Sequence, residues 1–420
     1  MTVLDDTRLR HAAVVAGELA AALAVPPSVD YGDDYRPESP RWRDQSLSKG
    51  AAGVAVLHGI RAQHGDGDAA PVHAWLTRAT LDDLSAGPGA GLWFGAPAVG
   101  FALHTAAPGR YRGASSSLDT AVADLTCTRL TAAFERMDAH QRPPLYEFDV
   151  VRGLTGLGAY LLRRDPGGNL VRDVLRYLVR LTEPVRADDP AGPRAPGWWT
   201  NDTPALETDP RFAAGQADFG AAHGIAGPLA LLALALLEGV TVDGHHDAIG
   251  AICRWLDAWR QQTTAGPWWP ERITLDELRD GQPHRSGPAR PSWCYGTPGL
   301  ARAQQLAALA TGNTARQHAA EDALARCVAD PRQLARITDP ALCHGWAGLV
   351  ATVLHAAADA ATPDLAHHLP GLIDSLLAHA HDTPPGDLPG LIEGSAGVAL
   401  TLHSIASGTT GPWPACLLLA

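Results

Sequence analysis

Two cysteines and one histidine in the second half of the chain have the residue types and the setting to hold a divalent metal ion. Cys294 lies in SWCYGTPG, two residues before a glycine, and the adjacent pair Cys343 and His344 lies in CHGWAG. Two thiolates and one imidazole are strong zinc ligands, and three protein ligands leave a fourth position open for water or substrate. Because structural zinc sites usually have four ligands at short local spacings such as CxxC, the pattern favours one exchangeable Zn²⁺ per chain.

Any one of these three residues could be an ordinary core residue, since a buried cysteine behaves as a small hydrophobic side chain. A metal site is favoured because all three stand at equivalent places in a turn that the sequence repeats. His223 stands at the same place in the copy AHGIAG. The other cysteines lack this placement and are interpreted as core or surface thiols: Cys127, Cys253, Cys327 and Cys416.

The repeated turn contains two glycines, most often as Gly-x-x-Gly, followed by a run rich in Ala, Leu and Val. Glycine allows backbone conformations and close backbone approaches that a side chain would prevent. The apolar run, about three turns long, predicts a helix buried on most sides. The second copy departs from the pattern because Ala98 replaces the second glycine. The first glycines of the seven copies are Gly50, Gly95, Gly153, Gly224, Gly296, Gly345 and Gly394.

Between the copies, amphipathic stretches such as 170–181 and 248–259 predict half-exposed helices. Buried and half-exposed helices that alternate seven times predict an all-α fold, an α/α toroid of helical hairpins with an inner and an outer ring. We expect residues 1–420 to form a single toroid domain in which the glycine turns gather at one end. An open helical solenoid is the alternative.

Three long connections rich in Pro or Trp interrupt the repeats, at 108–145, 183–218 and 266–292. Loops of this length in a compact domain usually cover a functional site or form small inserted subdomains. The sequence does not tell whether a β-rich insertion is among them. The tryptophan pairs at 198–199 and 268–269 are interpreted as loop packing rather than as direct substrate contacts.

The composition excludes several classes of protein. The formal net charge is −12, and so acidic a balance argues against a nucleic-acid partner, which requires clustered cations. Six cysteines in 420 residues are too few for a disulfide scaffold. The longest strongly apolar stretch, Ile225 to Leu237, is shorter than the roughly 20 residues of a membrane-spanning helix. Because the N-terminus also lacks the basic start of a signal peptide, we expect a cytoplasmic protein.

The elements WCYGxPG, CHGxxG and AHGxxG, together with the sevenfold glycine turn, resemble the LanC family of lanthipeptide cyclases. The resemblance extends from about Ser46 to about Ser404 and agrees in ligand types, ligand order and turn context. It implies a seven-layer α/α toroid and a stand-alone cyclase, since the chain has no room for the dehydratase or kinase domains of fused synthetases. The family's zinc ligands match Cys294, Cys343 and His344.

The resemblance also implies four catalytic residues. His223 matches a histidine that works as an acid and a base, and Asp149 in YEFDVVRGLTG would orient that histidine or relay its proton. Arg290 would hold Asp149 or a developing negative charge, and Tyr295 could donate a hydrogen bond to the same charged oxygen. The same residues are compatible with structural roles: His223 could cap the next helix from the core, and an Asp149–Arg290 pair could simply tie two loops together.

The activity that the resemblance implies is the addition of a peptide cysteine thiol across the double bond of dehydroalanine or dehydrobutyrine. A free thiol has a pKa of about 8.5, so zinc would be needed to supply the thiolate, and a histidine titrating near about 6.5 could carry the proton. The expected substrate is a dehydrated precursor peptide with leader and core. A lantibiotic dehydratase and an exporter are further candidate partners, and membrane association through such a complex is left open.

Two other functions remain compatible with the same residues. A LanC-like enzyme could add glutathione or another small thiol to dehydrated side chains, and a neighbouring gene for a Ser-, Thr- and Cys-rich precursor would argue against it. A non-catalytic peptide-binding scaffold would have a structural zinc whose fourth ligand comes from the protein. A glycosidase is disfavoured because such enzymes need paired carboxylates, and no second acid near Asp149 is evident in the sequence.

Overall fold

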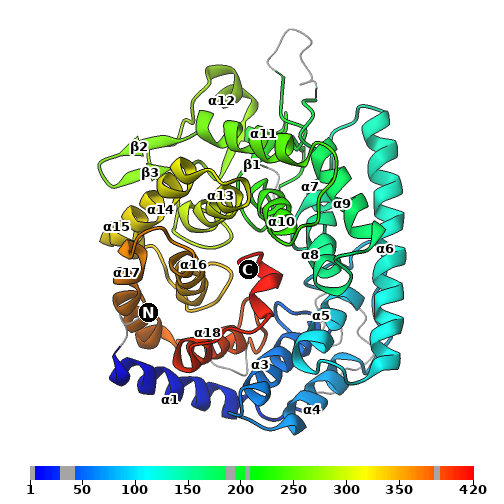
Figure 1. Cartoon of the computed structure of the whole chain (residues 1–420), viewed down its shortest axis with the longest axis vertical. Coiled ribbons are helices and arrows are strands. Elements are labelled where there is room, and N and C mark those ends of the chain that lie inside the picture. The colour runs from blue at the N-terminus through cyan, green and yellow to red at the C-terminus, as the bar shows by residue number, and fades with distance from the viewer. Residues whose placement is uncertain (1–4, 29–42, 186–193, 204–208, 383–387) are drawn as a thin grey trace. The chain divides into compact units, whose positions relative to one another are not determined.

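The structure is a computed structural model, and it describes residues 5–28, 43–185, 194–203, 209–382 and 388–420 (Figure 1). The chain divides into two compact units. The first unit contains Met1–Leu125, Thr338–Leu354 and Ala366–Cys416. The second unit contains Thr126–Ile337, His355–Leu365 and Leu417–Ala420.

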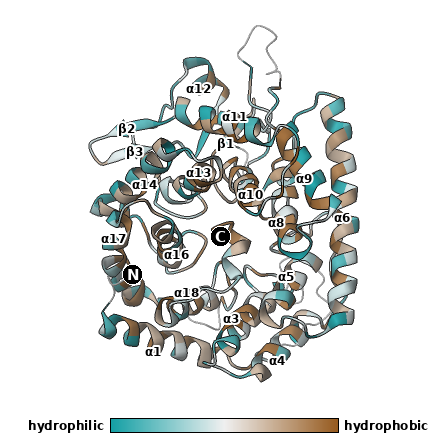
Figure 2. Cartoon of the chain, in the orientation of Figure 1, coloured by the Kyte–Doolittle hydropathy of each residue, from teal (hydrophilic) through white to brown (hydrophobic). Residues whose placement is uncertain are grey.

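A helix follows each of the seven glycine turns, as the repeats predict. Most of these helices are apolar, α10 with the sequence AGPLALLALALL above all (Figure 2). Every residue of α10 from Ala226 to Ala235 is buried. None of the helices in the described ranges is both long and apolar enough to cross a membrane. The seven helices are α3 (Ala51–Gln63), α5 (Ala96–Ala106), α8 (Leu154–Arg164), α10 (Ala226–Leu237), α13 (Thr297–Thr311), α16 (Trp346–Ala358) and α18 (Ser395–Ser407).

The helices between the turns bury one face only. In α9 (Asn169–Arg180) the residues Val171, Val174, Leu175 and Leu178 are buried at helical spacing, while arginines lie between them. The other such helices are α1 (Asp6–Ala22), α4 (Ala69–Ala79), α6 (Arg112–Asp138), α11 (His245–Ala258), α14 (Thr314–Ala329) and α17 (Asp364–His379). Short helical segments are α7 (Leu145–Phe148), α12 (Leu275–Asp280), α15 (Pro331–Leu334), η1 (Pro210–Phe212) and η2 (Trp413–Leu417).

One of the three predicted long loops is mainly a helix, so that prediction is wrong. The 27-residue helix α6 fills most of the segment 108–145. Its buried residues Leu118, Val122 and Leu125 recur at helical spacing, which a Ser- and Thr-rich sequence disguises. Only the flanks of this segment are loop, and the helix leads into α7.

The other two connections contribute short strands to the second unit. β1 (Gln216–Asp218) pairs antiparallel with β4 (Arg272–Thr274), and β2 (Gln261–Thr263) pairs antiparallel with β3 (Gly266–Trp268). Within the connection 183–218, residues 186–193 and 204–208 lie outside the described residues. Together with β2, which precedes the connection 266–292, the described parts form two small two-stranded sheets, and α12 follows β4.

All four tryptophans of the two pairs are buried, which confirms their interpretation as packing residues. Trp199 donates a hydrogen bond from its indole nitrogen to the carbonyl oxygen of Ala214, and Trp269 donates to that of Leu256. Ala214 lies in the same connection as Trp199, but the ring of Trp198 meets that of Trp255 in α11 edge to face, and Leu256 also belongs to α11. One tryptophan of each pair therefore fastens its connection to α11.

The glycine turns recur because no side chain fits between their backbone segments. A Cβ at Gly299, the second glycine of its turn, would lie 2.0 Å from the carbonyl oxygen of Trp293, six residues earlier. Real Cβ atoms do not approach so closely, so the position requires glycine. The same six-residue relation holds for Gly53 with Leu47 (2.2 Å), Gly227 with Ala221 (2.7 Å), Gly348 with Leu342 (1.8 Å) and Gly397 with Leu391 (1.9 Å).

Within each unit, the segments just before neighbouring turns are joined by backbone hydrogen bonds. In the second unit the N–H of Val150 donates to the carbonyl of Ala222, and the N–H of Ala221 donates to the carbonyl of Cys294. These two bonds place the third, fourth and fifth turns in a row. In the first unit Leu47 donates to Trp93, Leu391 donates to Leu47 and Cys343 donates to Ile392.

Candidate active site and metal centre

The third and fourth turns bring together a buried aspartate and a histidine. Asp149 follows α7, and its Oδ2 lies 2.7 Å from Nδ1 of His223, which precedes α10. Asp149 is completely buried, and its Oδ1 accepts hydrogen bonds from the backbone N–H groups of Arg152 and Gly153. Its own turn therefore holds the carboxylate facing the imidazole. The side chain of His223 is 21% exposed, so the ring is accessible to a ligand.

The charge state of His223 depends on a competition between burial and Asp149. Burial lowers the pKa of the imidazole, but the hydrogen bond and the negative charge of Asp149 outweigh it and raise the pKa above its ordinary value. A carboxylate bound at Nδ1 also fixes the neutral tautomer, in which Nε2 carries the lone pair. His223 is thus arranged to accept a proton at Nε2 and to release it again.

An aromatic ring that the sequence analysis did not single out packs against His223. The ring of Tyr146, in α7, meets the imidazole edge to face, with centroids 6.3 Å apart and an interplanar angle of 83°. The guanidinium of Arg152 lies over the same tyrosine ring, 4.7 Å from its centroid. The signal for this residue was its place in YEFD, three residues before Asp149.

A second buried acid, Asp218, lies in this cluster and was also missed. Its Oδ2 accepts a hydrogen bond of 2.7 Å from the hydroxyl of Tyr295, and its Oδ1 accepts one of 2.8 Å from the N–H of Gly220. The available signal was an aspartate inside the apolar segment QADFGAAHG, since a buried acid requires partners. The proton of Tyr295 is therefore directed to Asp218 rather than toward a substrate oxygen, which differs from the donor role expected for it.

Arg290 lies in the segment before the fifth turn, but it does not hold Asp149. Among the described residues no hydrogen bond or ion pair joins the two side chains, because backbone N–H groups and His223 occupy the carboxylate. The Nε of Arg290 is buried and has no hydrogen-bond partner in the described part of the chain. The alternative in which this pair ties two loops together is therefore wrong.

Cys294 belongs to the same row of turns as His223. The N–H of Ala221 donates to the carbonyl oxygen of Cys294 at 2.9 Å, and the negative charge of a Cys294 thiolate contributes to the raised pKa of His223. The thiol of Cys294 is buried, with its sulfur 3.5 Å from the hydroxyl oxygen of Ser292. A nucleophilic or metal-bound sulfur at this position would thus be next to the acid–histidine pair.

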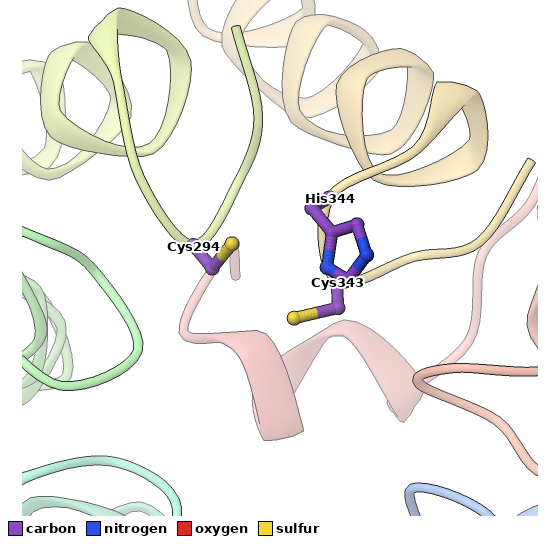
Figure 3. Close-up of side chains that lie close together, drawn as sticks. All are labelled: Cys294, Cys343 and His344. Atoms are coloured by element: carbon purple, nitrogen blue, oxygen red, sulfur yellow. The ribbon is translucent and has the colours of Figure 1, made fainter. Parts of the chain in front are cut away.

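The three predicted metal ligands come together in the structure. One ligand atom each of Cys294, Cys343 and His344 lies within 4.8 Å of the others (Figure 3). Nε2 of His344 is 3.5 Å from a carboxylate oxygen of Asp339, while Figure 3 shows the other ring nitrogen turned toward the two sulfur atoms. Two thiolates and an imidazole form a donor set that zinc favours, and a carboxylate on the far ring nitrogen is a common orienting partner of a zinc-bound histidine.

A separate cavity of about 670 Å³ in the second unit is lined by none of the predicted site residues. Its charged groups are mostly paired with one another, as in the ion pairs of Arg211 with Asp209 and of Arg285 with Glu271. The cavity is therefore not taken as the reaction site.

Comparison with known proteins decides the family. The model of a family described as "Lanthionine synthetase C-like protein" matches residues 41–418. The chain belongs to this family. Membership in the lanthionine synthetase C-like family agrees with the resemblance that the turn motifs carry.

Two known proteins resemble the chain, one in sequence over about half of its length and one in fold over nearly all of it. The "Nisin biosynthesis protein NisC" of Lactococcus lactis subsp. lactis is 26% identical over 211 residues. This match covers 50% of the chain and 48% of the relative, so it spans about half the length of each. A solved structure named "Nisin cyclase" matches 99% of the chain and 98% of its own, with a TM-score of 0.76 and 18% identity. That likeness shows the fold, so the prediction of an all-α, α/α-toroid fold is confirmed.

Proposed function

We propose that this chain is a zinc-dependent lanthipeptide cyclase. It would add cysteine thiols of a dehydrated precursor peptide to dehydroalanine or dehydrobutyrine and so form lanthionine and methyllanthionine rings. The observation that carries the proposal is the Asp149–His223 pair on the turn beside Cys294. Family membership supports it, as does the likeness to proteins named for nisin biosynthesis and nisin cyclisation.

Cys294, Cys343 and His344 would hold the zinc ion, with His344 binding through Nδ1 because its Nε2 faces Asp339. A bound zinc ion would lower the pKa of the substrate thiol from about 8.5 and so make thiolate available at neutral pH. Cys294 and Cys343 contribute two negative charges that offset the charge of a dication. A zinc ion held by these two thiolates would therefore leave a substrate sulfur more nucleophilic than a zinc ion held by three neutral histidines would.

His223 would move the proton. The substrate S–H proton goes to Nε2 of His223, the sulfur forms a bond to Cβ of the dehydro residue, and the double-bond electron pair moves into an enolate. His223 then returns a proton to Cα, so that the product has the same atoms as the substrate and no redox partner is required. Asp149 would hold Nδ1 throughout and stabilise the imidazolium that forms between the two steps.

Arg290 would stabilise the negative charge of the enolate. Its Nε is a buried donor without a partner among the described residues, and an enolate oxygen is the kind of acceptor that a guanidinium binds well. Tyr146 would complete the site as an aromatic wall that limits the rotation of the imidazole.

A peptide assay tests the proposal. The zinc-loaded protein is incubated with a dehydrated precursor peptide that carries dehydrobutyrine or dehydroalanine and a cysteine, and the remaining thiols are alkylated. Ring closure leaves the peptide mass unchanged and protects the thiol, so cyclised peptide gains no alkyl mass. We expect protection to appear faster than without protein, and His223→Ala to slow it by about 10²-fold or more while zinc is retained.

Glutathione in the same assay separates the proposal from a thiol transferase. A mass increase of one glutathione per dehydro residue, without ring closure, would assign the chain to small-thiol addition. Peptide binding without acceleration of either reaction would indicate a scaffold, and both results contradict the cyclase proposal.

A further inference from the structure

Asp218 has no part in the reaction as proposed above, although it is the more unusual of the two buried acids near His223. It ends strand β1, five residues before His223, and is completely buried. Burial raises the pKa of its carboxyl group above the ordinary value, against the opposing effects of the Tyr295 hydrogen bond and the Gly220 N–H. Keeping a carboxylate in such a place costs stability, which favours a role for it beyond packing.

The hydrogen bond between Asp218 and Tyr295 has a defined direction. A phenol has a single proton to donate, and a carboxylate can only accept. The phenol oxygen of Tyr295 lies 2.7 Å from Oδ2 of Asp218, so the proton of the phenol is directed to that carboxylate oxygen. The lone pairs of the phenol oxygen are then its remaining hydrogen-bonding capacity.

We propose that Asp218 is a positioning residue that binds the proton of Tyr295 and so makes the phenol oxygen an acceptor for an N–H group of the substrate peptide. The proposal rests on the proposed function and completes it. Arg290 supplies the donor for the substrate's enolate oxygen, and Tyr295, one residue after Cys294, supplies an acceptor for the peptide beside it. A peptide held at one oxygen and at one N–H is fixed in orientation as well as in place.

The substitution Asp218→Asn reverses this hydrogen bond without changing the shape of the side chain. The N–H of Gly220 requires an acceptor and therefore keeps the amide oxygen of the new residue on its side. The amide NH₂ then faces Tyr295 and donates to the phenol oxygen, and the tyrosine proton turns toward the peptide. The phenol of Tyr295 then presents a donor instead of an acceptor to the substrate, whose N–H group is itself a donor.

The experiment measures ring closure at varied peptide concentration for the zinc-loaded wild type, Asp218→Asn, Tyr295→Phe and the double variant. We expect Asp218→Asn and Tyr295→Phe each to raise KM about tenfold with kcat within about threefold, because an N–H contact binds ground state and transition state alike. We expect the double variant to equal Tyr295→Phe alone. Glu277→Gln is the matched control, since Glu277 is another buried acid that accepts backbone N–H bonds but does not contact Tyr295.

An unchanged or lower KM in Asp218→Asn would overturn the proposal, because the tyrosine proton would then be the useful group. A further loss from Asp218→Asn in the Tyr295→Phe background would also overturn it, because Asp218 would act elsewhere. A second readout, the NMR chemical shift of the Tyr295 Cζ atom, does not depend on activity. The protein is labelled with ¹³C at Cζ of its tyrosines, and the Tyr295 signal is the one that disappears in Tyr295→Phe. This signal should shift in Asp218→Asn, and an unmoved signal refutes the inference even if no peptide is cyclised. Absence of cyclisation by the wild type would count against the proposed function alone.

Discussion

The carboxylate of Asp149 binds Nδ1 of His223 at 2.7 Å across 74 residues of sequence, and its other oxygen is held by two backbone N–H groups. This arrangement determines more than the orientation of the ring. The two backbone donors keep Oδ1 in place, so the other side-chain atom always faces Nδ1 of His223. Whether that atom accepts or donates a hydrogen bond decides which tautomer the histidine adopts.

Asp149→Asn should therefore inactivate His223 without removing it. The amide oxygen would stay with the backbone donors, and the NH₂ group would face Nδ1 and force the proton onto Nε2. Nε2 could then no longer accept the thiol proton, and we expect ring closure to slow by about 10² to 10⁴-fold. The measurement is the single-turnover rate with zinc content determined in parallel. A normal rate with normal zinc would mean that the tautomer of His223 is irrelevant.

The group of Cys294, Cys343 and His344 predicts which substitutions cause the protein to lose zinc. Cys294→Ala, Cys343→Ala and His344→Ala should each reduce bound zinc well below one ion per chain, because each removes one of the three ligands proposed among the described residues. Metal analysis after gel filtration measures this. Cys127→Ala, which removes an exposed cysteine, is the control and should keep its zinc. Full occupancy in all three ligand variants would rule out this metal centre.

The close backbone approach at Gly299 predicts a loss of stability on substitution. In Gly299→Ala the new Cβ would meet the carbonyl oxygen of Trp293 at 2.0 Å, and the turn before α13 must deform. We expect a loss of about 1–3 kcal/mol or more, seen as a lower Tm or a lower urea midpoint. Gly17→Ala is the matched control, because Gly17 lies within α1 with nothing near its Cβ position. It should stabilise the protein by about 0.5–1 kcal/mol.

Two histidines, His355 in α16 and His403 in α18, predict that the folded protein loses stability in acid. Burial lowers the pKa of His355 and that of His403 to about 4 in the folded protein. An unfolded histidine titrates near about 6.5, so the unfolded chain binds more protons between these two values. The free energy of unfolding therefore falls as pH falls from about 6.5 to 4, by up to about 1.4 kcal/mol per pH unit for each histidine.

Thermal unfolding at pH 8, 6 and 5 measures this effect. His355→Leu should flatten the dependence, because Nε2 of His355 is buried without a hydrogen-bond partner among the described residues. The exposed His246→Gln should leave the dependence unchanged. Equal pH dependence in wild type and His355→Leu would show that this histidine does not contribute.

Much of the fold could be predicted because its signals are local. Each glycine turn stands within a few residues of the helix that it begins, so the seven copies and the seven apolar helices are visible along the chain. The helix in the segment 108–145 is not evident from the sequence, because its serines and threonines are also common in loops. The helical spacing of Leu118, Val122 and Leu125 becomes decisive only when a partner surface buries these side chains.

The site, too, could be predicted from the sequence only in part. The residue types, together with their equivalent places in the repeated turn, indicated a zinc group of Cys294, Cys343 and His344. The sequence could not show that Asp149 faces His223 instead of Arg290, that Asp218 takes the proton of Tyr295, or that Tyr146 packs on the imidazole. These pairings depend on where side chains from distant turns point. The tertiary structure decides that direction, because backbone bonds from Val150 to Ala222 and from Ala221 to Cys294 join turns that are far apart in the sequence.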